Sequence, residues 1–312
     1  MGSLFIAGNG FDIAHGISSS YGDFRKFLIK RFPEALEYRD KIIFVEDCEN
    51  IDVQEFAAEI LISTMDKVSG INWSNFEEAL AHIDFSDKLP KPNHKEDETD
   101  EEDRALMQKY LLYMDVLTNA FIYCTKYWQI FFQAWLKEVE MQVKSNILCK
   151  DSLKTLFNES DMMYFSFNYT TTLEKIYGIK KVTHIHNSIG KKLIFGHGED
   201  DATYSAYDET SSFGSSFLDD MIMKFKKDTD SSIKKNKGFF KRIDYNIDKV
   251  YSYGFSYGKV DSVYIKRIIH SISPDAVWHF TAFEAKDKEA LRIKKIKLRN
   301  YGFKGRFYIY EG

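Results

Sequence analysis

Short apolar segments alternate with helical segments over the second half of the chain, and this alternation constrains the fold more than any other feature. Apolar runs predict strands at residues 163–167, 182–186, 193–195, 250–253, 276–281 and 306–310. One more run, Leu4 to Ala7, comes early in the chain and is stopped by Gly8. Strands that alternate with helices form parallel sheets with right-handed crossovers. We therefore predict an α/β fold with a doubly wound, mostly parallel sheet.

A long stretch with almost no strand pattern interrupts this alternation. Its apolar residues step by three and four from Leu106 to Val139, which predicts a long amphipathic helix over 106–143. We expect an α/β domain made of 1–33 and 160–312, with 34–159 as a large helical insertion. The apolar stripe of the long helix has two interpretations, packing as core and homo-oligomerisation through 106–143.

Composition and charge narrow the class of protein. The formal net charge is −4, which gives no reason to expect attraction of the whole surface to nucleic acid. The chain has 3 Cys, and an odd, sparse count suits a reducing compartment. No leader-like segment precedes Leu4, and no apolar run reaches the length of about 18 residues expected of a membrane span. The expectation is a cytoplasmic protein without a membrane partner.

Small and polar residues follow five successive predicted strands. They are Gly8-Asn9-Gly10-Phe11-Asp12, Asn168-Tyr169-Thr170, His186-Asn187-Ser188, Gly196-His197-Gly198 and Gly254-Phe255-Ser256-Tyr257-Gly258. Ligands of open α/β sheets bind beyond the carboxyl ends of the strands. This joint pattern predicts a ligand site at that edge of the sheet.

The first of these loops contains Gly8 and Gly10, whose backbone amides can approach a phosphate. The full dinucleotide fingerprint is missing, because Ile13 stands where its third glycine belongs. A tight turn explains the glycines equally well. A carboxylate at Asp12 would repel a pyrophosphate, so we expect it to cap a helix, to hold a ribose hydroxyl or to position a water.

The histidines at the third strand end allow two interpretations. His184 and His186 lie two apart on a predicted strand and would face the same side, where His197 could complete a zinc site. The interpretation that we favour gives His184 a structural role and makes His186 a general base, since imidazole titrates near neutral pH.

The loop from Gly254 to Gly258 matches the G-x-S-x-G pattern of a nucleophile elbow. Asp275 and His279 follow in the order that a serine hydrolase requires, but His279 lies within a predicted strand. A hydroxyl that binds a ribose is the simpler role for Ser256.

Basic residues crowd the stretch 224–242, which holds eight Lys or Arg against Asp228 and Asp230. Such runs are usually solvated surface, and a patch for nucleic acid or an acidic partner is the alternative.

Several stretches together resemble one known family. They are GNGFDIAHGISSSYGDF, NWSNFEEAL, FSFNYTTTLEKIYG, THIHNS, IFGHG and YGFSYGKVDSVYI, in this order along the chain. They resemble the AbiH family of bacteriophage abortive infection proteins over roughly residues 4–310. The resemblance implies a role in bacterial defence against phage, with a phage or host protein as trigger.

A more distant likeness is to sirtuin-like NAD-binding domains. The loop Gly8 to Asp12 is similar to their glycine loop, Asn168-Tyr169-Thr170 to their Asn-x-Asp motif, His186-Asn187 to their His-Gly, and Gly254-Phe255-Ser256 to their Gly-Thr-Ser loop. Asp12, Thr170 and Asn187 depart from the pattern, and no four-cysteine zinc ribbon is present. The likeness implies a sirtuin-like Rossmann variant that binds NAD or a related nucleotide.

These resemblances imply roles for individual residues. The expected catalytic residues are His186 and Asn168, and the expected nucleotide-binding residues are Gly8, Asn9, Gly10, Phe11, Asp12, Thr170, Gly254 and Ser256. If the protein is an enzyme, it is expected to hydrolyse the nicotinamide glycosidic bond. Two alternatives stay open: a non-catalytic nucleotide-binding or phage-sensing module, and a metal-dependent nuclease or other hydrolase that uses Asp12, His15 and the basic stretches.

Overall fold

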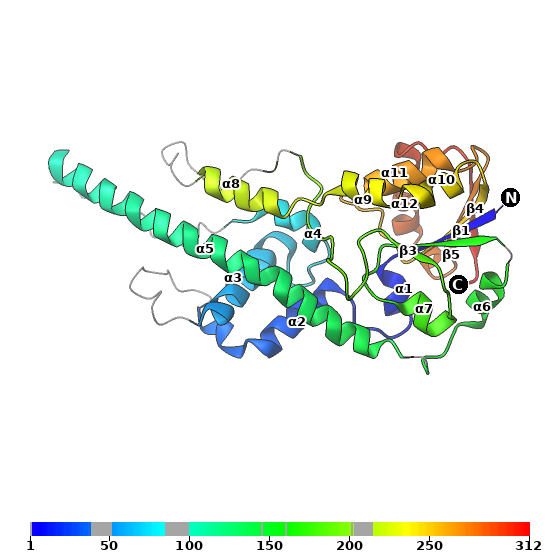
Figure 1. Ribbon diagram of the computed structural model, residues 1–312, viewed down its shortest axis with the longest axis horizontal. Coiled ribbons are helices and arrows are strands. Elements are labelled where there is room, and N and C mark those ends of the chain that lie inside the picture. Colours follow the sequence, from blue (N-terminus) through cyan, green and yellow to red (C-terminus); the bar gives the residue numbers. More distant parts are fainter. Residues whose placement is uncertain are drawn as a thin grey trace. The chain divides into compact units, whose positions relative to one another are not determined.

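The computed structural model describes residues 2–38, 52–84, 100–144, 146–159, 161–200, 202 and 215–312. The chain divides into two compact units (Figure 1). The first comprises 1–20, 136–198 and 227–312, and the second comprises 21–135 and 199–226. The domain boundaries that we expect from the sequence stay a prediction.

The first unit is built around a six-stranded sheet whose paired strands are all parallel. Its strands are β1 (Gly2–Ala7), β2 (Met162–Ser166), β3 (Val182–His184), β4 (Ile247–Tyr253), β5 (Val277–Thr281) and β6 (Arg306–Tyr310). Their order in the sheet is β3-β2-β1-β4-β5-β6, so the first strand of the chain is central. This is the order of a doubly wound dinucleotide-binding fold, and the predicted fold class is confirmed.

Helices cover both faces of the sheet. The helices of this unit are α1 (Asn9–Ile13), α6 (Asp151–Phe157), α7 (Thr172–Tyr177), α9 (Thr229–Lys235), α10 (Lys237–Ile243), α11 (Ser262–Ser271) and α12 (Lys288–Asn300), with a 3₁₀-helix at Glu284–Lys286. Apolar residues of α1, α6 and α7 pack with Phe5 and Tyr251 on one face. Residues of α10, α11 and α12 pack with Leu4, Ile6 and Val250 on the other. Each central strand therefore has apolar residues on both sides, as the continuous run Leu4 to Ala7 predicts.

The second unit is a cluster of helices with an aromatic core. It contains α2 (Tyr21–Arg31), α3 (Val53–Ser69), α4 (Phe76–Ala79), α8 (Ser215–Lys224), 3₁₀-helices at Pro33–Tyr38 and Leu80–His82, and most of α5 (Asp100–Gln142). Phe24 packs against Trp73, Phe76 and Trp135. Asp66 accepts hydrogen bonds from Arg25 and from the Trp73 indole, which fixes α2 and the turn after α3 to each other.

Two expectations about local structure are wrong. Residues 193–195 form no strand: the Ile194 amide donates to the His186 carbonyl at 3.0 Å, and the Tyr169 hydroxyl donates to the Ile194 carbonyl at 3.0 Å. The third strand ends at His184, before His186. These two hydrogen bonds satisfy the His186 carbonyl and the Ile194 backbone within a loop. The segment therefore needs no neighbouring strand.

Candidate functional site

Four of the predicted loops follow strands that are neighbours in the sheet. In the order β3, β2, β1, β4, these strands lead to His186, Asn168, Gly10 and Ser256. Because the strands are parallel, the four loops leave the same edge of the sheet (Figure 1). The strand order reverses between β1 and β4, and that reversal is where such sheets bind ligands.

The glycines of the β1 and β4 loops are needed for close contact between the two backbones. A Cβ on Gly10 would lie 2.6 Å from the Gly254 Cα, and a Cβ on Gly8 would lie 2.6 Å from the Phe255 Cα. Gly254 also has a positive φ of 62°, where glycine is favoured. The Gly8 amide donates to the Tyr253 carbonyl and the Gly10 amide to the Gly254 carbonyl. These two amides are therefore already engaged, and the tight-turn interpretation accounts for the glycines.

Asp12 lies at the centre of a buried polar cluster formed by the β1 and β2 loops. Its side chain is buried, and Oδ2 accepts a hydrogen bond of 2.5 Å from the Thr170 hydroxyl. Thr172 in turn donates to the Thr170 hydroxyl at 3.1 Å. Burial raises the pKa of Asp12 to about 6, although the hydrogen bond from Thr170 and the nearby polar groups of Thr172 and Asn168 act in the opposite direction. Among the described residues, Asp12 Oδ1 has no hydrogen-bond partner.

Asn168 joins the cluster to the neighbouring loops. Its Nδ2 donates to the Gly8 carbonyl at 3.0 Å, and its own carbonyl accepts from His184 Nδ1 at 3.0 Å. The other ring nitrogen of His184, Nε2, lies 2.8 Å from Glu174 Oε1. The hollow lined by Asn168, Thr170, Thr172 and His184 is too narrow to hold a water molecule.

Three residues between Asn9 and His15 contact other parts of the unit rather than the Asp12 cluster. His15 donates from Nδ1 to the Phe11 carbonyl and accepts from the Tyr177 hydroxyl at Nε2, both at 2.7 Å. Burial lowers the pKa of His15, which favours this neutral form. The Phe11 ring is buried in the core below the sheet edge. The Asn9 side chain accepts a hydrogen bond from Ser19 at 2.5 Å.

His186 belongs to a second buried network. Its Nε2 lies 3.0 Å from Asp261 Oδ1, and the Lys227 Nζ lies 3.2 Å from the same oxygen and 3.4 Å from His186 Nε2. Burial alone would raise the pKa of Asp261, but Lys227 and His186 together hold it below its ordinary value. His186 Nδ1 is buried and has no hydrogen-bond partner in the part of the chain that the structure describes.

The geometry of this network orients the His186 ring. The carboxylate of Asp261 accepts a hydrogen bond from Nε2, so Nδ1 is the ring nitrogen left for a further contact inside the unit.

The histidines do not converge on a common point in the way that the zinc interpretation requires. His184 is bonded to Glu174, and His186 is bonded to Asp261. Within the described ranges, no group of three or more His, Cys, Asp or Glu residues is placed to hold a metal ion.

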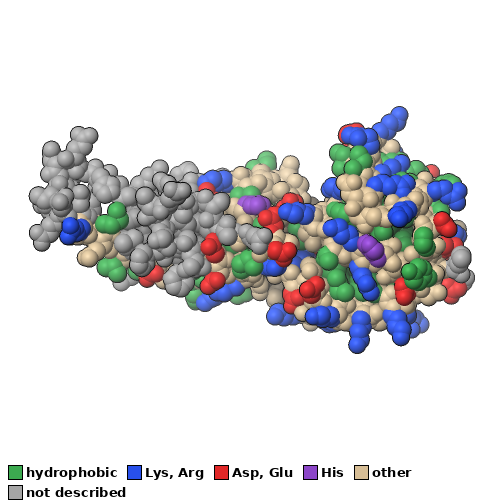
Figure 2. Space-filling view, turned by 90° about the horizontal axis from the view of Figure 1, so that it is seen from above, with side chains coloured by type: hydrophobic (Ala, Val, Ile, Leu, Met, Phe, Trp, Pro, Cys, Tyr) green, Lys and Arg blue, Asp and Glu red, His purple; other side chains and the backbone are tan. Residues whose placement is uncertain are grey.

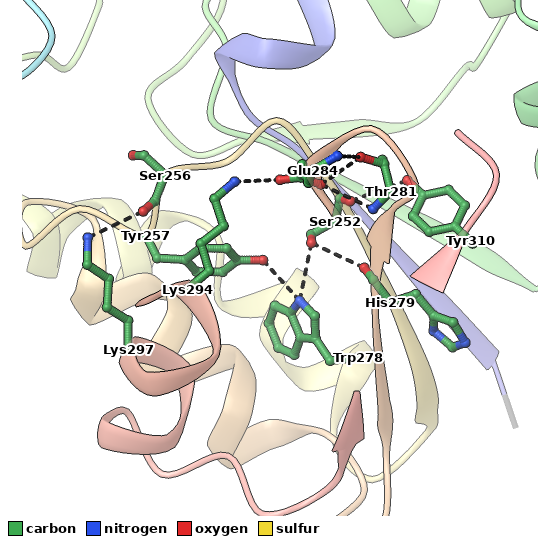
Figure 3. A network of polar contacts seen from close by, with 10 residues as sticks. All are labelled: Ser252, Ser256, Tyr257, Trp278, His279, Thr281, Glu284, Lys294, Lys297 and Tyr310. Carbon is green, nitrogen blue, oxygen red and sulfur yellow. Dashed lines mark hydrogen bonds and ion pairs between the residues drawn. The ribbon is translucent and has the colours of Figure 1, made fainter. Parts of the chain in front are cut away.

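Ser256 is exposed and lacks the geometry of a nucleophile elbow. The left-handed residue of this loop is Tyr257, with a φ of 55°, rather than the serine. Figure 3 shows the Ser256 and His279 side chains pointing away from each other. The His279 ring stacks on Tyr251, with centroids 4.4 Å apart, and Nδ1 lies 3.3 Å from the Val250 carbonyl. The Ser–His pair that a serine hydrolase requires is therefore not formed.

A third network, which the sequence reasoning missed, lies at the end of β5 (Figure 3). Glu284 accepts from the Thr281 amide and hydroxyl, and it forms an ion pair of 2.5 Å with Lys294. The Thr281 hydroxyl accepts from the Glu284 amide, so the two residues form a capping box. The signal was present in the sequence as Thr281-Ala282-Phe283-Glu284.

Asp261 and Lys227 were also missed. Asp261 follows the G-x-S-x-G match by three residues and directly precedes α11. An aspartate at this position is common as a helix N-cap, so the sequence did not mark it as functional. Lys227 lies in the basic run 224–242, which the sequence presents as solvated, yet its side chain is 0% exposed. No local pattern distinguishes a buried lysine from its exposed neighbours.

The comparisons with known proteins give one result. The family model for bacteriophage abortive infection AbiH matches residues 4–282. Neither the search of curated proteins nor the search of solved structures gives a match. No helix among the described residues is both long enough and apolar enough to span a bilayer.

The matched range contains the glycine, asparagine and histidine loops at the sheet edge, and it covers most of the chain. The chain belongs to the AbiH family of bacteriophage abortive infection proteins.

Proposed function

We propose that this antiphage protein binds NAD, or a closely related nucleotide, at the carboxyl edge of its sheet and hydrolyses the nicotinamide glycosidic bond. The observation that carries the proposal is the Asp12 cluster. A buried carboxyl group with an unpartnered oxygen lies beside Asn168 and Thr170. It follows the central strand of a sheet with the strand order of dinucleotide-binding folds.

The proposed reaction needs a base but no acid. The bond between the ribose C1′ and the nicotinamide nitrogen breaks, and its electron pair neutralises the positive charge of the nicotinamide ring. A water oxygen forms the new bond to C1′, and the water gives up one proton. A group with a pKa near neutrality suits this task, and the pKa of Asp12 is about 6.

The other predicted residues support this base. Asn168 orients the attacking water or the carboxamide, and Thr170 positions the Asp12 carboxylate through its hydroxyl. His186 Nδ1 accepts a hydrogen bond or a proton from a ribose hydroxyl or from the water. The engaged Gly8 and Gly10 amides leave phosphate contacts to other groups of these loops.

The test is to follow free nicotinamide while the purified protein is titrated with NAD, with and without an extract of infected cells. We expect release by the wild type, a decrease of about 100-fold in Asp12→Asn from loss of the base, and unchanged release in Asp275→Asn, an exposed control. Nicotinamide release that Asp12→Asn retains in full would contradict the role of Asp12.

The alternative is a non-catalytic nucleotide-binding or phage-sensing interaction module, which one observation favours. The hollow at Asn168 is too narrow to hold a water molecule, whereas ligand sites usually have a volume of about 300–1,000 Å³. Binding of NAD by calorimetry without release of nicotinamide, in the presence of infected-cell extract, would establish this alternative and exclude hydrolysis.

A further inference from the structure

A groove of about 580 Å³ opens on the helical layer formed by α9, α10 and α11. Three helices contribute cations to it: Lys234 from α9, Lys237 and Lys241 from α10, and Arg267 from α11. Figure 2 shows Lys and Arg side chains gathered on this side of the α/β unit. The basic stretch of the sequence thus contributes to a concave surface, together with an arginine that lies outside it.

The charges in this groove are largely uncompensated. Lys237 and Lys241 are one helical turn apart, and like charges at this spacing destabilise a helix. In the described part of the chain neither of them forms an ion pair with a carboxylate, and Asp244 is the one acid that lines the groove. By contrast, Lys227 from the same basic stretch is paired with Asp261. The groove therefore keeps a positive field that an anionic ligand would neutralise.

The floor of the groove indicates how such a ligand is held. Ile233 and Phe240 line it, but the Phe240 ring is buried, packs against Phe165 and lies under the Arg267 guanidinium at 6.0 Å. No face of this ring is left for stacking on a base. Recognition would therefore depend on charge along a backbone, with little dependence on base sequence.

The size of the groove favours a flexible polyanion over a rigid one. Its volume of about 580 Å³ is in the range of about 300–1,000 Å³ found for ligand sites. That space accepts a short length of a flexible strand, whereas a rigid duplex would rest on the rim. The phosphates of a single strand repeat closely enough to meet cations from adjacent helices.

The groove is separate from the site at the strand ends. Lys241 and Asp244 come at the end of α10 and just before β4 begins at Ile247. They therefore lie toward the amino edge of the sheet, whereas Asp12 and Asn168 follow the carboxyl ends of β1 and β2. We infer that the groove formed by Lys234, Lys237, Lys241 and Arg267 binds single-stranded nucleic acid through its phosphates.

The experiment measures fluorescence anisotropy of a labelled oligothymidylate with the full-length protein. We expect binding that weakens with salt, with a slope of log K against log salt of roughly −3 for four phosphate contacts. Lys237→Glu combined with Lys241→Glu should weaken binding by at least about tenfold and make the slope shallower. Lys180→Glu combined with Lys181→Glu, at exposed positions that do not line the groove, makes the same change of charge and should alter binding by less than about twofold.

One further variant and two further binding measurements test the proposal. Arg267→Lys retains the charge and should bind nearly as the wild type does, and thermal melting checks that all variants fold. Poly-glutamate of equal charge should compete weakly, and a duplex of the same length should bind less tightly than the single strand. Equal loss of binding in the two double variants, no binding by the wild type, or equal competition by poly-glutamate would overturn the inference.

Discussion

At the scale of single residues, Asp12 is the side chain whose environment departs most from what its sequence position suggests. Its place after a glycine loop is compatible with a helix cap, a ribose contact or a water ligand. The structure shows instead a buried carboxyl group. One of its oxygens accepts a hydrogen bond from Thr170, and the other has no hydrogen-bond partner among the described residues. The strand-end rule identified this residue from sequence, but its burial depends on contacts with residues about 160 positions later.

The pKa of Asp12 makes the stability of the protein depend on pH. Burial raises it from 3.8 to about 6, so the folded state binds a proton that the unfolded state has released. The free energy of unfolding should therefore fall by roughly 2 kcal/mol as the pH rises from about 4 to about 6. Asp12→Asn should lack this fall, so its stability relative to the wild type should increase over this range.

Urea unfolding of both proteins between pH 4 and 7 measures this difference. Asp275→Asn, at an exposed position, is the matched control and should follow the wild type. Parallel curves for Asp12→Asn and the wild type would show that Asp12 does not carry the proton.

His186 shows which part of the candidate site the sequence did not reveal. Its role as a strand-end base was predicted, but its partners Asp261 and Lys227 lie 75 and 41 residues away. Each of the three groups compensates for the burial of the others. Their arrangement is a tertiary property, and no spacing within the sequence encodes it.

Substitutions in this network should be strongly non-additive. Lys227→Met removes the buried ammonium that pairs with Asp261, and Asp261→Asn removes the carboxylate that pairs with Lys227, so each single change should cost about 3 kcal/mol of unfolding free energy. The double variant should cost clearly less than the sum. A double-mutant cycle by chemical unfolding measures the coupling, and the exposed pair Glu289 and Arg292 should show none.

At the scale of elements, the strands were easier to predict than the loops. The apolar runs of β1, β2, β4 and β5 were recognised because buried strands need continuous apolar residues, whereas β6 is an edge strand with exposed residues that was recognised from its apolar sequence alone. The run 193–195 has the same character but belongs to a loop, because its backbone groups bond to His186 and Tyr169. Apolar character indicates burial, and only a neighbouring strand makes a buried segment part of a sheet.

The contact between the β1 and β4 loops explains the glycines in both of them. A Cβ on Gly254 would lie 2.4 Å from the Gly10 backbone, at a φ of 62°. Gly254→Ala should therefore cost at least about 3 kcal/mol, since overpacking adds to the strain of a left-handed residue.

Gly16→Ala is the matched control, because Gly16 has a φ of 74° but a Cβ added there would meet no described atom within 4 Å. It should cost only about 1–2 kcal/mol. Thermal melting compares the two, and equal destabilisation would mean that the backbone contact contributes little.

At the scale of the whole molecule, the sheet extends beyond the part of the chain that the family model matches. The match ends at residue 282, but α12 and β6 follow, and β6 pairs with β5 along five residues from Val277 to Thr281. Phe303 and Phe307, between α12 and the end of β6, complete the apolar core around Trp278 and Phe280.

A chain that stops after Asn300 should therefore fail to fold stably. It loses Phe303 and uncovers the edge of β5, which promotes association between sheets. We expect most of this variant in aggregates by size-exclusion chromatography. Removal of Glu311 and Gly312 alone, beyond the end of β6, should leave most of the protein monodisperse, and a soluble, cooperatively melting Asn300 variant would contradict the prediction.

The central place of β1 has a consequence for how the protein is made. Phe5 leaves the ribosome well before its neighbours in the sheet, which are Tyr164 and Tyr251. During translation the strand has no partner until β2 emerges, and its second side stays open until β4 follows. Synthesis that is cut short before β4 would therefore leave the central strand with one side unpaired.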